Sequence, residues 1–210
     1  MPHEHKLPRT LMLIALFGWC LGMAAVAQAQ EPLPNAVQIE VLVFEYVNGG
    51  AGSEAAERPG DDGYRDLYVL SEPAGDGWYR VIPASKQRLA GASGVLGRSS
   101  RTRLLLHSGW QQPSRDSRRI VLRSDSEVHT SDPDRGMLSG LKPAAEGWVE
   151  LQSGRGLRLQ LSFDHRRQQD GELTLFRMDQ TRVINPGEIQ YFDHPAFGVL
   201  VRVDSIDEGL

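Results

Sequence analysis

The sequence has 210 residues, a formal net charge of −4 at pH 7 and a single cysteine. A chain of this length can bury one sizeable apolar core, so we expect one main domain. Its acidic balance argues against nucleic acid or anionic lipid as a partner.

Residues 1–29 have the pattern of a secretory signal peptide. Lys6 and Arg9 make the start positive, and residues 11–26 are apolar apart from small breaks. Small residues at Ala27 and Ala29 fit the signal-peptidase rule. The apolar run of ~16 residues is short for a membrane span of about 20. We therefore expect cleavage and no stable membrane insertion, with an uncleaved anchor as the alternative.

Cys20 lies inside this segment, after Trp19 rather than after the small residue that a lipoprotein signal requires. The mature chain, residues 30–210, would then contain no thiol, which excludes disulfides and cysteine-based sites. Its net charge would be −5, because Glu4, Lys6 and Arg9 are removed. We expect a single extracytoplasmic domain without a cofactor.

The first half of this domain begins with a strand at residues 37–47, which is apolar on both faces and therefore typical of the centre of a sheet. A Gly- and acid-rich loop at 48–63 and short extended segments at 64–70 and 78–82 follow. Ser85 is the expected N-cap of a helix that ends near Arg98.

A strand at residues 101–110 and a segment at 118–123 are predicted to pair as a hairpin. A second polar loop covers residues 124–147. Strict alternation on both sides of residues 153–156 predicts another hairpin, from 148–151 to 157–163. Further extended segments are expected at 172–178, 181–184 and 197–203. The expected fold is α+β, mainly antiparallel sheet with one clear helix and two long polar surface loops.

The C-terminal run at 187–198 concentrates polar and aromatic groups. If Glu188 begins a strand, Asp193 points to the opposite face, so the two carboxylates are not expected to form an acid–base pair. We expect Asp193 to close the turn at His194-Pro195 by accepting backbone N–H bonds. A ligand contact, or a catalytic or metal role with His194, is the alternative.

Three segments, residues 38–45 (QIEVLVFE), 105–113 (LLHSGWQQP) and 187–198 (GEIQYFDHPAFG), resemble the CsiV family in sequence and in order. These are periplasmic proteins of Gram-negative bacteria linked to cell-shape integrity. The segments bracket about three-quarters of the mature chain. The family tends to have His where Gln190 stands, and two arginines where Thr181-Arg182 stands.

The resemblance implies a non-catalytic peptidoglycan-binding protein of the periplasm. It also implies partners, namely a class A penicillin-binding protein and its lipoprotein activator. Two other hypotheses remain open. One is a cell-wall hydrolase or metal-dependent enzyme that uses Glu188, Asp193 and His194, and the other is an adaptor that binds only proteins.

Four arginines of the predicted 101–123 hairpin are candidate peptidoglycan-binding residues: Arg101, Arg103, Arg119 and Arg123. Guanidinium groups bind carboxylates through paired hydrogen bonds, and the peptide stems of peptidoglycan carry carboxylates. The alternative is an ordinary solvated strand face.

Exposed aromatic rings can stack on the apolar face of a sugar, which makes Trp110 and Tyr191 candidates, together with the neighbouring His194. Trp78 and Trp148 are further aromatic residues of this kind. Each ring is also a candidate for the core, because large aromatic side chains are mostly buried.

Overall fold

A computed structural model of the chain describes residues 35–49, 68–70, 78–130, 140–169 and 172–206. The predicted signal peptide and most of the predicted loop at 48–63 lie outside these residues. The described part contains one α-helix, α1 (Ala90–Arg98), one short 3-10 helix, η1 (Ala84–Lys86), and strands that pair almost entirely antiparallel. The predicted α+β class, mainly antiparallel sheet with one clear helix, is confirmed.

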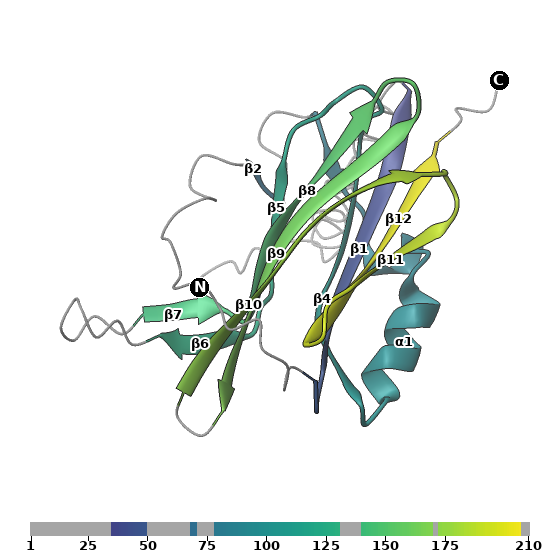
Figure 1. Cartoon of the computed structure of the whole chain (residues 1–210). Helices are drawn as coiled ribbons and strands as arrows, with labels where there is room; N and C mark the ends of the chain where they lie inside the picture. Colours follow the sequence, from purple (N-terminus) through teal and green to yellow (C-terminus); the bar gives the residue numbers. More distant parts are fainter. Residues whose placement is uncertain (1–34, 50–67, 71–77, 131–139, 170–171, 207–210) are drawn as a thin grey trace, which may run out of the picture. The chain divides into compact units, whose positions relative to one another are not determined.

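The first sheet has β1 at its centre, in the order β11–β12–β1–β4–β3 (Figure 1). Its strands are β1 (Ala36–Tyr46), β3 (Arg80–Val81), β4 (Thr102–Pro113), β11 (Ile189–Asp193) and β12 (Phe197–Ser205). Val41 of β1 lies opposite Val201 on one side and Ser108 on the other. The central position predicted for this strand is confirmed.

The second sheet has the order β10–β9–β8–β5–β2. Its strands are β2 (Tyr68–Val69), β5 (Ile120–Arg123), β8 (Ala145–Ser153), β9 (Leu157–Gln169) and β10 (Glu172–Ile184). β8 and β9 form the predicted hairpin, and β2 pairs with β5 in parallel. A small separate hairpin joins β6 (Glu127–Thr130) to β7 (Gly140–Pro143).

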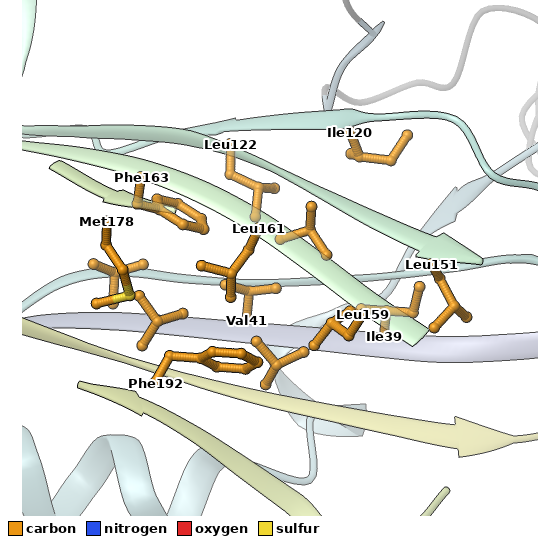
Figure 2. Close-up of a cluster of buried hydrophobic side chains, with 14 of the residues drawn as sticks. Ile39, Val41, Ile120, Leu122, Leu151, Leu159, Leu161, Phe163, Met178 and Phe192 are labelled. Atoms are coloured by element: carbon orange, nitrogen blue, oxygen red, sulfur yellow. The ribbon is translucent and has the colours of Figure 1, made fainter. Parts of the chain in front are cut away.

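The core lies between the two sheets. Figure 2 shows Val41 of β1 and Phe192 of β11 on one side, and Leu161 and Phe163 of β9 on the other. All four side chains are buried almost completely. Because side chains alternate along a strand, each sheet contributes every second residue to this layer.

The outer face of the first sheet is also apolar, and α1 covers part of it (Figure 1). Leu42 and Phe44 of β1 pack there against Leu89 and Leu96. This second contact explains why β1 is apolar on both faces, since one face meets the other sheet and the opposite face meets the helix.

The helix begins later than predicted. Ser85 lies in η1, and Leu89 is the residue before the first turn of α1. The backbone N–H groups of Arg88 and Leu89 donate to the buried carboxylate of Glu40, at 2.7 and 2.8 Å. The prediction that Ser85 caps the helix is wrong, because Leu89 is the N-cap residue and makes no side-chain cap bond, while Glu40 binds the backbone that leads into the helix.

The predicted pairing of segments 101–110 and 118–123 is also wrong. Their strands lie in different sheets, since β4 pairs with β1 and β3, whereas β5 pairs with β8. The connection between them carries the chain across the core, so that Ile120 and Leu122 face the core from the opposite side. The polar stretch 124–147 also contains β6, β7 and the start of β8, and residues 172–184 form one strand.

Candidate functional site

The four candidate arginines are divided between the two sheets. Arg103, on β4, lies 2.9 Å from the carboxylate of Glu45, and Arg101 is exposed just before β4. Arg119 and Arg123 lie at the two ends of β5 in the second sheet. The four therefore do not share one hairpin face, because the hairpin itself does not form.

Trp110 lies in the core, with none of its surface exposed. Its indole N–H donates to Oε1 of Gln112 at 2.6 Å, and the Gln112 amide donates to the Asp116 carbonyl at 2.9 Å. In this arrangement the Trp110 ring packs inside the protein, and the Gln112 side-chain amide is hydrogen-bonded to a backbone carbonyl.

On β11, Phe192 lies on the face opposite Tyr191 and Asp193, as the alternation predicted, and it is buried while the other two are exposed. The Tyr191 hydroxyl donates to Oδ1 of Asp193 at 2.5 Å, and the Tyr46 hydroxyl donates to the same oxygen at 2.9 Å. The two hydroxyl groups also contact each other. We call Tyr46, Tyr191 and Asp193 the tyrosine–aspartate cluster.

The cluster rests on a close packing of rings. The Tyr191 ring stacks on Phe44 with 6.4 Å between centroids. Gly198 of β12 provides the space, because a Cβ atom there would lie 2.6 Å from the Phe44 ring and 3.0 Å from the Tyr191 ring. Since the Tyr191 side chain is 40% exposed, the cluster presents an aromatic ring beside a carboxylate at the surface.

Burial and the neighbouring Asp193 carboxylate raise the pKa of Tyr191, and its bond to Tyr46 adds to the rise. Burial and Asp193 also raise the pKa of Tyr46, although its bond to Tyr191 opposes them. Both phenols are therefore protonated donors at neutral pH.

Asp193→Asn is expected to lower the pKa of both phenols toward the ordinary value of 10.0, because the carboxylate charge that disfavours tyrosinate is removed. A spectrophotometric titration of tyrosinate would measure the shift. Glu188→Gln, which also removes one exposed carboxylate from the C-terminal run, should leave the titration unchanged. An Asp193→Asn curve identical to that of the natural chain would contradict the bonding described here.

The turn after β11 is closed by His194 and not by Asp193. The backbone N–H of Ala196 donates to Nδ1 of His194 at 3.1 Å, and the backbones of His194 and Phe197 exchange two hydrogen bonds. The His194 side chain is buried against Phe176 and Phe197. The predicted role of Asp193 in the turn is wrong because its carboxylate binds the two tyrosines.

The three residues of the enzymatic alternative have separate hydrogen-bond partners. Glu188 accepts from the Asn185 amide at 3.2 Å, whereas Asp193 and His194 make the contacts given above. In the part of the chain that the structure describes, no three His, Cys, Asp or Glu side chains are grouped so that they could hold a metal ion.

A buried ionic cluster that the sequence analysis missed joins the two sheets. Nε2 of His165 lies 2.9 Å from Glu45, and its Nδ1 lies 3.1 Å from the Ala144 carbonyl oxygen. Burial alone would raise the pKa of Glu45. The His165 hydrogen bond and the positive charges of His165, Arg103 and Arg167 outweigh it, and the pKa of Glu45 is lowered.

Arg167 is the most connected member of this cluster. From β9 of the second sheet its guanidinium donates to the carbonyls of Gly49, Tyr46 and Ala196, at 2.6, 2.9 and 3.2 Å, and to Glu45 at 3.2 Å. These bonds connect β9 of the second sheet to two turns of the first sheet, the one that follows β1 and the one between β11 and β12. The sequence did contain a signal for this cluster. Every second residue of a strand shares one face, so residues 163, 165 and 167 point to the same side as the core, and two of them are basic.

The free edge of β11 is protected by side chains from β10. Arg182 donates to the Tyr191 carbonyl at 2.8 Å, and Gln180 donates to the Asp193 carbonyl at 3.2 Å. Such bonds occupy groups that would otherwise pair with another chain. Of the positions where the chain departs from the CsiV pattern, Thr181 is exposed and Gln190 is half-buried opposite Val201.

Comparison with known families places the chain in a class of peptidoglycan-binding proteins. The matching family model spans residues 10–206, nearly the whole sequence, and is described as "Peptidoglycan-binding protein, CsiV". The chain therefore belongs to the CsiV family. No curated protein and no solved structure matches it. Neither helix that the structure describes is long and apolar enough to cross a membrane.

Proposed function

We propose that the chain is a non-catalytic peptidoglycan-binding protein of the periplasm. Membership of a peptidoglycan-binding family over residues 10–206 is the observation that carries this proposal. The signal-peptide pattern at 1–29 supports export, with residues 30–210 as the single mature domain.

The proposal includes a role in cell-wall biogenesis and cell shape. In this role the chain supports synthesis by a class A penicillin-binding protein, together with the lipoprotein activator of that enzyme. The resemblance of the three quoted segments to the CsiV family supports these partners. A non-catalytic role fits the observation that Glu188, Asp193 and His194 each bind a different hydrogen-bond partner.

Exposure supports five of the candidate binding residues. Arg103 and Arg123 lie on strands, Arg101 and Arg119 lie just before strands, and Tyr191 lies on β11; all five have exposed side chains. Trp110 and His194 are buried, so their contribution is to hold the scaffold.

The test is sedimentation of residues 30–210 with purified sacculi at moderate salt. The folded natural chain is expected to sediment with the sacculi. A heat-unfolded sample serves as the control and shows whether that binding requires the folded structure. Retention of all the folded protein in the supernatant would count against peptidoglycan as the ligand. If the same protein then bound a purified class A penicillin-binding protein, the adaptor hypothesis would take its place.

The enzymatic alternative is tested with the same preparation. A zymogram on sacculi should show no clearing, and Asp193→Asn should leave that result unchanged. Clearing that disappears in Glu188→Gln or Asp193→Asn would replace the binding role with hydrolysis.

A further inference from the structure

Trp148 lies on the face of the second sheet that points away from the core. On β8 its neighbours Gly147 and Val149 are buried and belong to the inward-facing set, while the Trp148 side chain is half-buried. It lies opposite Ser162 of β9, which in turn lies opposite Asp179 of β10. A large ring therefore has a small polar side chain as its neighbour on the next strand.

Arg119 precedes β5 and lies beside this ring, and Arg123 ends the same strand opposite Glu146. The Arg119 Cζ atom is 4.2 Å from the centroid of the Trp148 ring, which is a cation–π contact. Nε of Arg119 donates to Glu150 at 3.0 Å, and Nε of Arg123 donates to Glu146 at 2.7 Å.

Both arginines keep their outer edge available. Their side chains are 45% and 40% exposed. No hydrogen bond to another described residue uses Nη1 or Nη2 of either Arg119 or Arg123. A guanidinium held through Nε is oriented in advance, and its two terminal nitrogens form a fork that fits a carboxylate.

The carboxylates that hold these arginines have second donors. Glu150 also accepts from the Gln152 amide at 2.5 Å, and Glu146 also accepts from Arg166 at 3.4 Å. The negative charges are therefore shared with other donors, which leaves the two guanidinium groups able to attract a further anion.

The spacing of the arginines sets a condition on that anion. Arg123 follows Arg119 after four residue steps of extended chain, which corresponds to about 13 Å at 3.3–3.4 Å per residue. One carboxylate cannot bind both forks. A ligand that uses both must carry carboxylates at separate positions, and it must also present an apolar face if it is to contact Trp148.

We propose that this outer face of the second sheet binds peptidoglycan through its peptide-bearing glycan. Arg119 and Arg123 bind separate carboxylates of the peptide stems, and Trp148 contacts the apolar face of a sugar. The proposal rests on the peptidoglycan-binding function above and adds the face and the groups that are recognised.

The decisive comparison uses two double variants with the same change in charge. Arg119→Gln with Arg123→Gln removes both forks, whereas Arg98→Gln with Arg115→Gln removes two exposed arginines that are not binding candidates, one at the end of α1 and one in the connection after β4. In sacculus sedimentation at constant salt, the affinity of the first variant is expected to fall by about tenfold or more. The second variant is expected to bind like the natural chain. Circular dichroism and urea unfolding check that both remain folded.

Two further measurements separate charge, geometry and sugar contact. Arg119→Lys with Arg123→Lys keeps both charges without the forks, so it should still bind several-fold more weakly than the natural chain. Trp148→Leu should weaken binding to intact sacculi and to sacculi stripped of peptides by an amidase. The natural chain should bind the stripped sacculi less well than the intact ones.

The outcomes distinguish this proposal from the function on which it rests. If the natural chain does not sediment at all, the proposed function fails. If it sediments and the Arg119/Arg123 glutamine variant sediments equally, the binding face proposed here is wrong while the function stands. Equal losses in the two glutamine variants would show a simple effect of net charge and would also overturn the proposal.

Discussion

Replacing Arg167 with alanine is expected to lower the free energy of unfolding by about 3–5 kcal/mol, the usual cost of removing one partner from a buried ion pair. The guanidinium is only 15% exposed and donates to three carbonyls as well as to Glu45. Without it, β9 loses its connection to the turns at Gly49 and Ala196. Urea denaturation at neutral pH would measure the change.

Two variants test this explanation. Arg101→Ala removes an exposed arginine whose side chain has no hydrogen bond to the described residues, and should change stability by less than about 0.5 kcal/mol. Arg167→Lys keeps the charge but cannot reach several carbonyls at once, so its stability should lie between those of the natural chain and Arg167→Ala. Equal stability of the lysine variant and the natural chain would show that the carbonyl contacts contribute little.

The sequence was informative where the fold depends on local alternation. β1 was predicted nearly to its observed bounds, and the β8–β9 hairpin was predicted at the right turn although both strands are longer than expected, because burial on one or both faces sets the pattern of apolar residues directly. The same alternation put Phe192 on the face of β11 opposite Tyr191 and Asp193, and the structure shows that the Phe192 face is the buried one. These features need no knowledge of distant partners.

The errors concern contacts between distant segments. Pro113 at the end of β4 and the alternation in residues 118–123 suggested a hairpin, but both strands have an apolar face and either sheet can use it. The backbone that leads into α1 is bound by Glu40, about 50 residues earlier, which no local capping rule can detect. Trp110 was a candidate for sugar binding until its place in the core was known.

The candidate site shows the same contrast between what local sequence predicts and what depends on contacts between distant segments. Residue type alone selected the arginines, but their usefulness for binding depends on which sheet and which face they occupy. Arg103 pairs with Glu45 at the surface of the first sheet, with its side chain 70% exposed, whereas Arg119 lies over the Trp148 ring on the outer face of the second sheet. Tertiary structure, and not composition, decides which arginines are available for a ligand.

Gly147→Ala is expected to destabilise the protein by about 3 kcal/mol or more, at the upper end of the usual cost of overpacking. A Cβ atom on Gly147 would lie 2.3 Å from the backbone oxygen of Ser162 and 2.3 Å from the Phe163 ring. The oxygen belongs to β9, which is paired on both sides and cannot move alone, and the Phe163 ring is fully buried in the core. The added methyl group must therefore separate β8 from β9 or displace the ring.

The matched control is Gly91→Ala in α1, where no atom lies within 4 Å of the added Cβ. It should raise stability by about 0.5–1 kcal/mol, because alanine is the better helix former. Urea denaturation of both variants would then show shifts of opposite sign for the same chemical change. A loss below about 1 kcal/mol in Gly147→Ala would mean that β8 and β9 can move apart at this point, and the close packing of the second sheet on its core would be wrong there.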